Sequence, residues 1–348
     1  MRGRVPLGPG RFGARGMRAA VVAAAWAVCA ACGSTTGGQA PAQRPSASML
    51  WVAATASQAI AWVAEAGGYF KKDGVDVSLS FLSGSPTASA ALVGGHVDFV
   101  QMAGPAVVTA DAKGAHEVMV MGLVNQPTFA LMTSPDVRTP DQLKGKTVGV
   151  VQVGSSDDFM LRAALTHWGL RAGSDVKITP LNSIQGQIAA FQQHLVQGLV
   201  VDPPNDVLAE KAGAQLMTRI ADLGIQYQAA GLVTTRTYLQ GHRDVVVKVV
   251  QAMIEAVHRF KTDRAFAMKV MGQYLKTDDG QVLQASYDGF AKVFARVPLP
   301  NRAGLQQIES QYLAAGTIDA PVAVSSMVDE SVVTQLQRSG FIDRAYAG

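Results

Sequence analysis

Cysteine is almost absent from this chain. The sequence holds only two cysteines, Cys29 and Cys32, and both lie in its first 32 residues. The rest of the chain therefore has no internal disulfide, no cysteine ligand for a metal and no cysteine nucleophile. Aromatic residues are also scarce, at 7%, which disfavours an aromatic-lined nucleic-acid surface. After the first 32 residues no apolar run reaches about 18 residues, so we expect no membrane-spanning helix there.

Acidic residues are missing from the first 31 residues, which carry five arginines: Arg2, Arg4, Arg11, Arg15 and Arg18. Without these five, the 30 basic residues of the chain become 25, against 26 acidic ones. The remaining chain is near neutral, which disfavours binding to nucleic-acid phosphates. A short apolar run, residues 17–32, ends in small residues. These features predict a signal peptide over residues 1–31 and export across the inner membrane.

Residues 30–34 (AACGS) resemble the cleavage box of bacterial lipoproteins, in which the cysteine becomes the lipidated N-terminus. The resemblance implies lipidation of Cys32 and a membrane contact through that lipid only, at the periplasmic or outer cell surface. Cys29 stands where such boxes usually have an aliphatic residue, and ordinary signal cleavage is the alternative. Residues 32–48 are rich in Ser, Thr, Gly, Pro, Gln and Ala, which predicts a flexible tether.

Strands and helices alternate along the body of the chain. Apolar runs and two-residue alternation predict strands at 50–53, 75–81, 97–100, 118–123, 128–133, 147–151, 176–181, 199–201 and 231–235. Helical spacing and capping residues predict helices at 58–66, 85–93, 104–112, 157–168, 184–193 and 205–211, and an almost wholly helical segment after 235. This alternation predicts an α/β protein with mostly parallel sheets flanked by helices.

The elements fall into two groups, which predicts two lobes. We expect lobe one to contain residues 49–127 and 236–348, including the C-terminal helices, and lobe two to contain residues 128–235. The chain then crosses between the lobes near Pro127 and again near Gly231. Two crossings make a hinge.

Three segments resemble the signatures of one family, the nitrate/sulfonate/taurine and thiamine-precursor binding proteins of ABC importers, also called sulfonate-binding/THI5-like or NMT1-like. They are residues 65–77 (EAGGYFKKDGVDV), Asp98-Phe99 and residues 141–150 (DQLKGKTVGV). One departure is the segment from His194 to Gln197, where the family usually has Gly and Asp.

The resemblance implies a two-lobed, type II periplasmic-binding-protein-like fold with a ligand cleft between the lobes. It implies a monomer that captures a small organic solute and delivers it to an ABC permease and ATPase. The solute would be a sulfonate, a taurine-like zwitterion or a thiamine-precursor-like heterocycle. A sensory module on the same fold is an alternative that the sequence does not separate from import.

In open α/β sheets, ligands bind beyond the carboxyl ends of the strands. Loops at those ends contain the small polar residues that we predict to bind the ligand: Ser57, Gln58, Ser83, Gly84, Ser85, Gln101, Gly104, Gly154, Ser155, Ser156 and Asp202. Ser85 and Ser156 begin helices, whose N-termini favour an anionic group, although both serines are equally well explained as helix caps.

Two features modify the expectation of an anion site. Asp157 and Asp158 would repel an anion, but in the first turn of a helix we expect them to point to solvent. Asp202 follows an apolar strand and is the candidate for contacting an amine, its alternative being a turn acceptor before Pro203. A zwitterion or a neutral heteroaromatic compound fits this mixture better than bare nitrate.

No residue pattern predicts catalysis. The six histidines are scattered without metal-ligand spacing, and neither a phosphate loop nor a nucleophile elbow is present. We therefore expect no metal and no cofactor. Fungal relatives with this fold are enzymes that make the thiamine pyrimidine with a Cys-rich motif and pyridoxal phosphate. This chain lacks that motif, so a pyrimidine-precursor synthase is the less favoured interpretation.

Overall fold

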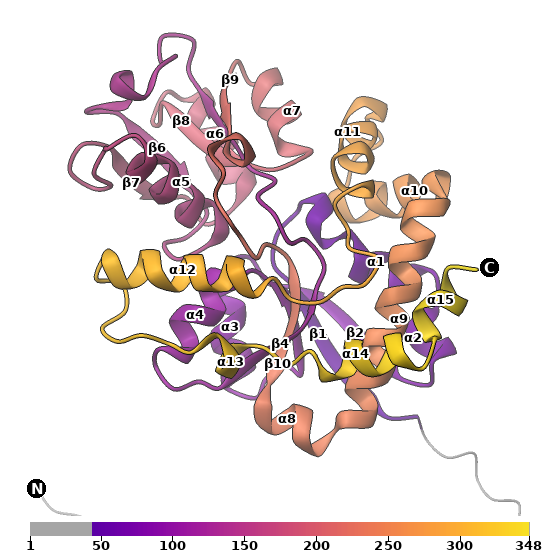
Figure 1. Ribbon diagram of the computed structural model, residues 1–348. Coiled ribbons are helices and arrows are strands. Elements are labelled where there is room, and N and C mark those ends of the chain that lie inside the picture. Colours follow the sequence, from indigo (N-terminus) through magenta and orange to yellow (C-terminus); the bar gives the residue numbers. More distant parts are fainter. Residues whose placement is uncertain (1–43, 348) are drawn as a thin grey trace, which may run out of the picture. The chain divides into compact units, whose positions relative to one another are not determined.

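The computed structural model describes residues 44–347, which contain two separate five-stranded sheets (Figure 1). The predicted signal peptide, Cys32 and most of the predicted tether lie outside the described residues. Between residues 44 and 347, no helix is both long and apolar enough to cross a bilayer.

Each sheet has the same arrangement of strands. The first has the order β2 (Asp76–Phe81), β1 (Ser46–Trp51), β3 (Phe99–Met102), β10 (Gly231–Thr235) and β4 (Glu117–Gly122). The second has the order β7 (Lys177–Pro180), β6 (Thr147–Val150), β8 (Gly198–Val201), β5 (Ala130–Thr133) and β9 (Gln215–Arg219). In both, the fourth strand is antiparallel to its two neighbours and the first three pair in parallel. The prediction of a mostly parallel sheet in each lobe is confirmed.

The antiparallel strands are those that follow a crossing between lobes. β5 is the first strand after the chain enters lobe two, and β10 is the first after it returns to lobe one. A chain that arrives from the other lobe enters at the edge where the parallel strands end, so it must run in the opposite direction to them. The two antiparallel strands therefore follow from the two crossings.

Two expected boundaries are corrected, and one strand was not predicted. The predicted lobe two ended at residue 235, but β10 pairs with β3 and β4, so residues 231–235 belong to the sheet of lobe one. β1 begins at Ser46, inside the segment expected to be tether. β9 had no strand prediction, because Gln215–Arg219 mixes polar and apolar residues at an exposed sheet edge.

Helices cover both sheets. In lobe one these are α1 (Ala59–Ala66), α2 (Tyr69–Lys72), α3 (Ser85–Val93) and α4 (Gly104–Asp111). In lobe two they are α5 (Ser156–His167), α6 (Ile184–Gln192) and α7 (Asn205–Lys211), with short 3₁₀ turns at Pro140–Leu143 and Ile220–Leu223. The C-terminal helices are α8 (Arg236–Gly241), α9 (Arg243–Thr262), α10 (Arg264–Leu275), α11 (Gly280–Ala291), α12 (Arg302–Ala314), α13 (Val324–Met327), α14 (Ser331–Arg338) and α15 (Phe341–Ala345).

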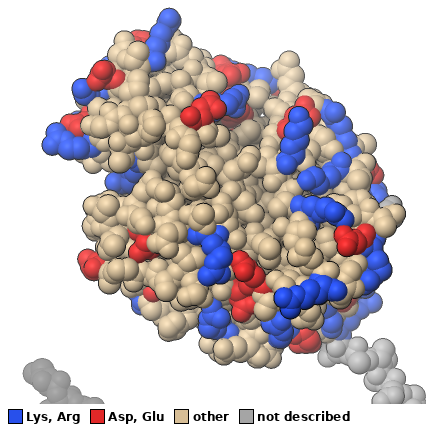
Figure 2. Space-filling view, viewed as in Figure 1, with Lys and Arg blue, Asp and Glu red and all other residues tan. Residues whose placement is uncertain are grey.

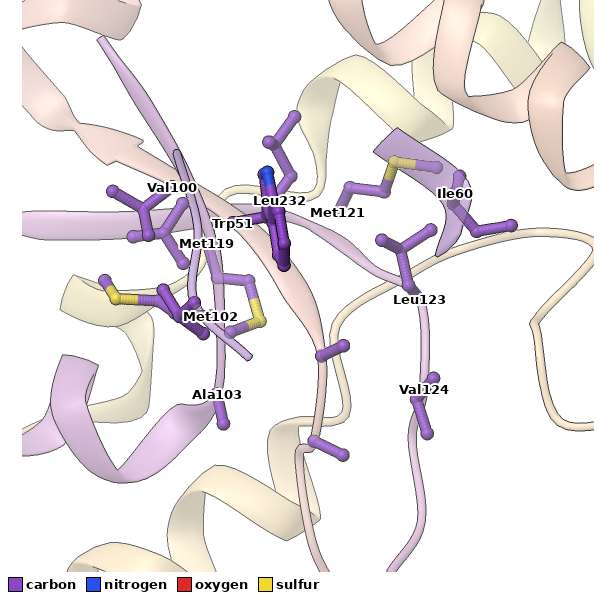
Figure 3. Packing of buried hydrophobic residues seen from close by; sticks show 14 of the residues in the cluster. Trp51, Ile60, Val100, Met102, Ala103, Met119, Met121, Leu123, Val124 and Leu232 are labelled. Carbon is purple, nitrogen blue, oxygen red and sulfur yellow. The ribbon is translucent and has the colours of Figure 1, made fainter. Parts of the chain in front are cut away.

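The larger apolar core spans both lobes, with most of its residues in lobe one. Val100, Met119 and Leu232 come from three neighbouring strands and are fully buried together (Figure 3). The long helix α9 packs on α1, and its apolar side chains recur at helical spacing from Val245 to Phe260. Burying a side chain such as Val or Leu contributes about 1.5–3 kcal/mol, so this helix anchors the C-terminal segment to lobe one. Lys and Arg side chains gather over these C-terminal helices, at the right of Figure 2.

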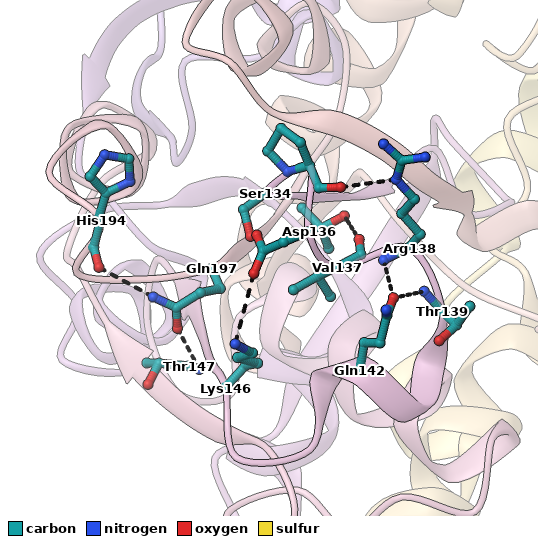
Figure 4. A network of polar contacts seen from close by, with 12 residues as sticks. Ser134, Asp136, Val137, Arg138, Thr139, Gln142, Lys146, Thr147, His194 and Gln197 are labelled. Atoms are coloured by element: carbon teal, nitrogen blue, oxygen red, sulfur yellow. Dashed lines mark hydrogen bonds and ion pairs between the residues drawn. The ribbon is translucent and has the colours of Figure 1, made fainter.

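The segment from His194 to Gln197 departs from the family pattern, and lobe one shows what the usual residue does. There the Asp98 carboxylate accepts a hydrogen bond from the backbone N–H of Ser48, at 2.7 Å, and so joins the starts of β3 and β1. In lobe two the Gln197 side-chain carbonyl accepts from the backbone N–H of Thr147, at 3.2 Å, and its amide donates to the carbonyl of His194 (Figure 4). An amide therefore makes the contact that a carboxylate makes in lobe one.

The two crossing segments run side by side and share a third partner. The N–H of Ala229 donates to the carbonyl of Val124, at 2.9 Å. Asn301, the N-cap of α12, donates from its side chain to the carbonyl of Asn125, at 2.8 Å, and to that of Tyr227, at 3.3 Å. Both crossings are thus tied to the start of α12, which packs on α4 of lobe one.

Candidate functional site

A pocket lies between the two lobes, at the carboxyl ends of the parallel strands. It encloses about 620 Å³, including its solvent-filled mouth. Its wall contains residues of both lobes: Val52, Ala53, Thr55, Ser57, Gln58, Gly84, Ser85, Ala103, Thr128, Phe129, Val151, Ser155, Ser156, Asp157, Ile184, Gln187, Val200, Val201, Asp202, Ala229 and Ala230. Pockets for small organic ligands have this mixture of apolar walls with a few polar groups.

Seven of the eleven predicted ligand-binding residues lie on this wall. They are Ser57, Gln58, Gly84, Ser85, Ser155, Ser156 and Asp202. Because each follows the carboxyl end of a strand, the general geometry of open α/β sheets brings them together. Contact between these residues and a solute remains a prediction.

The other four predicted residues lie outside the pocket wall and have structural contacts. The Ser83 hydroxyl donates to the carbonyl of Asn182 in the opposite lobe, at 2.8 Å. Gln101 is fully buried and donates to the carbonyl of Ser57, at 2.9 Å. The N–H of Gly104 donates to the carbonyl of Gln228, and that of Gly154 to the Asp158 carboxylate, at 2.8 Å. These residues support the wall instead of forming it.

The two serines at helix starts are not the caps of their helices. The N-cap residues are Gly84 for α3 and Ser155 for α5, so Ser85 and Ser156 are the first helical residues. Neither N-cap makes a side-chain cap hydrogen bond. The interpretation of Ser85 and Ser156 as caps is therefore wrong, and both hydroxyl-bearing residues line the pocket.

Asp157 and Asp158 do not point to solvent, contrary to the expectation. Asp157 is 5% exposed and Asp158 is 1% exposed. The Asp157 carboxylate accepts hydrogen bonds from the backbone N–H of Val151, from the Ser155 hydroxyl and, at 2.9 Å, from the Gln187 amide. Burial raises the pKa of Asp157 to about 6, although its donors act in the opposite direction. Both acids do lie in the first turn of α5, but they are buried there.

Asp202 follows β8 and is 3% exposed. Its carboxylate accepts one hydrogen bond, from the Thr55 hydroxyl of the opposite lobe, at 3.0 Å. Burial raises the pKa of Asp202 to about 7, and the nearby Asp206 and Asp157 carboxylates raise it further, while the Thr55 hydrogen bond lowers it. Near neutral pH this carboxyl is therefore poised between its two protonation states.

The lobes contact each other on both sides of the pocket. On one side the Thr87 hydroxyl donates to the Gln152 side-chain carbonyl, at 3.1 Å. On the other side the N–H of Ala56 donates to the carbonyl of Pro203, and the Asn205 amide donates to the carbonyl of Ala54, both at 3.3 Å. The two lobes are thus hydrogen-bonded to each other on both sides of the pocket.

Sequence reasoning missed several wall residues. Thr128 and Phe129 lie at the end of the first crossing, Ala229 and Ala230 lie at the end of the second, just before β10, and Gln187 lies one turn inside α6. These residues lie in the crossings and within a helix, whereas the predicted ligand contacts lie in the loops that follow strands. Gln187 lies four positions after the Ser183 N-cap, but α6 also contains Gln185 and Gln192, so the residue type alone did not single it out.

Comparisons with known proteins agree with the geometry. The model of the family described as "NMT1/THI5 like" matches residues 56–263. No curated protein matches the sequence of this chain.

Solved structures share the fold at low sequence identity. A protein of Bordetella bronchiseptica RB50 is 18% identical with a TM-score of 0.74, and the match covers 85% of this chain and 98% of that one. The alkanesulfonate-binding protein SsuA of Xanthomonas axonopodis pv. citri, bound to MOPS, is 19% identical with a TM-score of 0.71, covering 83% and 100%. The periplasmic nitrate-binding protein NrtA of Synechocystis PCC 6803 is 13% identical with a TM-score of 0.70, covering 85% and 89%. The predicted two-lobed binding-protein fold is confirmed.

Proposed function

Because this chain belongs to the NMT1/THI5 like family, we propose that it is the solute-binding component of an ABC importer, which holds a small organic solute in the interlobe pocket and delivers it to a permease and ATPase. The observation that carries the proposal is the pocket itself. Its wall is built from both lobes at the carboxyl ends of their strands, where open α/β folds bind ligands.

The mechanism follows from the contacts across the pocket. A solute that touches both lobes stabilises the closed arrangement relative to an open one, since it gains its contacts only when the lobes meet. The two crossings at residues 123–129 and 224–230 form the hinge. The closed form would then be the one that docks on the permease.

Location and anchoring belong to the same proposal. A signal peptide at residues 1–31 would export the chain, lipidation of Cys32 would anchor it, and the mature protein would act outside the cytoplasm as a monomer. The Arg-rich leader and the AACGS box support this. Intact-mass analysis of the membrane-extracted protein tests it, because an unmodified N-terminus beyond Cys32 contradicts lipidation.

A synthase of the thiamine pyrimidine is less well supported. Attachment of pyridoxal phosphate needs a lysine for the Schiff base, and none of the residues described on the pocket wall is a lysine or a cysteine. The wall instead offers hydroxyls, amides and two carboxyls within mainly apolar surroundings, which suit reversible binding.

The test of the proposed function is a thermal-shift screen of small organic solutes with the purified protein. A solute at about 100 times its dissociation constant adds about 2.7 kcal/mol to the free energy of unfolding, which raises the melting temperature measurably. The proposed function predicts at least one such solute, recovered chemically unchanged after incubation. Conversion of that solute into another compound would instead support an enzyme.

A further inference from the structure

The charged groups of the pocket wall are all acidic. Asp157 and Asp202 are on the wall, and neither lysine, arginine nor histidine is found among the wall residues of the described chain. Both carboxyls are at least 95% buried. An anionic solute would therefore meet two like charges and no opposite charge in a region of low dielectric, which costs free energy.

The two carboxyl groups differ in the number of hydrogen bonds that they accept from the protein. Asp157 has three donors, from Val151, Ser155 and Gln187, so its charge is held by the protein itself. Asp202 has one side-chain donor, the Thr55 hydroxyl on Oδ2, and its own backbone N–H also stabilises the charged form. A buried carboxylate ordinarily accepts several hydrogen bonds, so Asp202 has unused acceptor capacity facing the pocket.

A second unused acceptor lies on the same wall. Gln187 is fully buried, and its Oε1 has no hydrogen-bond partner in the described part of the chain. The amide cannot simply be turned over, because its nitrogen donates to the Asp157 carboxylate at 2.9 Å. Leaving a buried carbonyl unpaired is unfavourable, so this oxygen also calls for a donor from a bound molecule.

The positive ends of the helix dipoles at the pocket do not outweigh the two acidic groups of the wall. The chain's own acids lie beside the α5 N-terminus and offset its dipole, since Asp158 accepts from the N–H of Gly154 and Asp157 accepts from that of Val151, both in the loop before the helix. The N-termini of α3, at Gly84 and Ser85, and of α6, at Ile184, lack a carboxylate among their described partners. An anionic group can lie there only as one end of a solute whose other end satisfies the acids.

We propose that the solute of this pocket carries an N–H donor group that is cationic at neutral pH, such as an ammonium or an amidinium, which binds the carboxylate of Asp202, with Gln187 Oε1 accepting from a further donor. This proposal rests on the proposed function and narrows it. Anions without an N–H donor, such as simple sulfonates or nitrate, are excluded as the solute. Zwitterions remain included.

Probes matched in carbon skeleton test the proposal. Benzylamine and benzamidine are compared with phenylmethanesulfonate and benzoate, and taurine with ethanesulfonate, by thermal shift and calorimetric titration. We expect binding from the N–H donors and none from their anionic partners. Tighter binding of an anion than of its matched amine overturns the ligand class but leaves the proposed function standing. If solutes of every class fail to bind, both are overturned.

Asp202→Asn is the direct variant, and Asp206→Asn is its matched control. Asp206 lies four residues further along, and its carboxylate faces Arg219, at 3.9 Å, instead of the pocket. Because a charge-assisted hydrogen bond is lost, Asp202→Asn is expected to lower the affinity about 10- to 100-fold for the amine that binds. The affinity of Asp206→Asn for the same amine is expected to stay within about 2-fold of that of the unaltered protein. Circular dichroism and melting temperature establish that both variants fold, and equal amine affinity in Asp202→Asn refutes the proposal.

A pH profile of the unaltered protein gives a readout that does not depend on any variant. The Asp157 and Asp206 carboxylates and the Tyr227 phenol interact electrostatically with Asp202, and burial together with the two carboxylates raises the pKa of Asp202 to about 7. A cationic solute binds the ionised form of Asp202, so the affinity of the protein for that solute should rise from pH 5.5 to pH 8 and then level off. Below pH 7, binding of the solute should release a proton. An anion would show affinity falling over the same range, and that result contradicts the proposal.

Discussion

At the scale of single residues, the buried carboxyl groups are those whose protonation the fold changes. Glu117 on β4 is fully buried, and its Oε1 accepts a hydrogen bond from the Ser89 hydroxyl at 2.7 Å. Its other oxygen has no partner among the described residues. Burial raises the pKa of Glu117 from 4.5 to about 8, so the native protein keeps this carboxyl protonated at neutral pH.

Glu117 therefore predicts a direction for stability against pH. Between pH 4.5 and about 8 the native state holds a proton that the unfolded state has released, so the free energy of unfolding falls as pH rises. The slope for one such group is about 1.4 kcal/mol per pH unit. Glu117→Gln removes this proton linkage, and we expect chemical denaturation at pH 5.5 and 7.5 to show a smaller loss of stability than in the unaltered protein.

The control for this prediction is Glu210→Gln, which changes an exposed side chain of α7. It should leave the pH dependence as it is. Asp157 and Asp202 also have raised pKa values and contribute a fall of the same sign, so part of the slope persists in Glu117→Gln. An unchanged slope in Glu117→Gln would show that Glu117 does not hold the proton.

At the scale of elements, α12 meets the second crossing closely. Gly304 lies in its first turn, and a Cβ atom there would come within 2.4 Å of the backbone carbon of Tyr227. The neighbouring Asn301 bonds to both crossings, so the helix start and the hinge form one unit. Only glycine permits this approach, since the obstacle is backbone and cannot move aside like a flexible side chain.

Gly304→Ala is therefore expected to destabilise the protein, against the usual preference of helices for alanine. Alanine in a helix ordinarily gains about 1 kcal/mol over glycine, but the clash with Tyr227 should produce a net loss of about 1–3 kcal/mol. The free energy of unfolding from urea denaturation measures it. Gly280→Ala in α11 is the control, because a Cβ there meets nothing within 4 Å and neutral or higher stability is expected. Equal stability of the two variants would show that α12 does not pack on the crossing.

At the scale of the whole folded body, the proposed closure brings side chains of the two lobes into contact beside the pocket. Gln152 of lobe two lies beside Thr87 and Ser83 of lobe one, with its amide 3.0 Å from the Thr87 hydroxyl and 3.4 Å from the Ser83 carbonyl. The wall residues nearby remain in place without this side chain, because Gln152 itself does not line the pocket.

Gln152→Ala is expected to weaken solute binding without removing a solute contact. A hydrogen bond across the lobes contributes about 0.5–1.5 kcal/mol, so the affinity should fall about 3- to 10-fold, mostly through faster dissociation. Stopped-flow kinetics measures the rates, and small-angle scattering should show a larger radius of gyration without solute than with it. Gln337→Ala, on an exposed position of α14, is the control. Unchanged dissociation in Gln152→Ala would refute a contribution of this contact to closure.

Much of the fold was predictable because its signals are local. Apolar alternation and helix caps located all strands except β9 to within a few residues, and the alternation of strands with helices indicated a mostly parallel sheet in each lobe. The carboxyl-end rule located seven of the eleven predicted site residues on the pocket wall. Each of these inferences needs only neighbours in the chain and the periods of helix and strand.

The sequence by itself determined the classes of element, their order, the two-lobed α/β architecture and the scarcity of groups suited to catalysis. Only the tertiary structure decided that β10 joins the first sheet, that Asp157 and Asp158 are buried, and that Gln187 reaches the pocket. The physical reason is that burial and pairing depend on which distant segments meet. Thr55 and Asp202 are 147 positions apart, and no local pattern shows that closure brings them within a hydrogen bond.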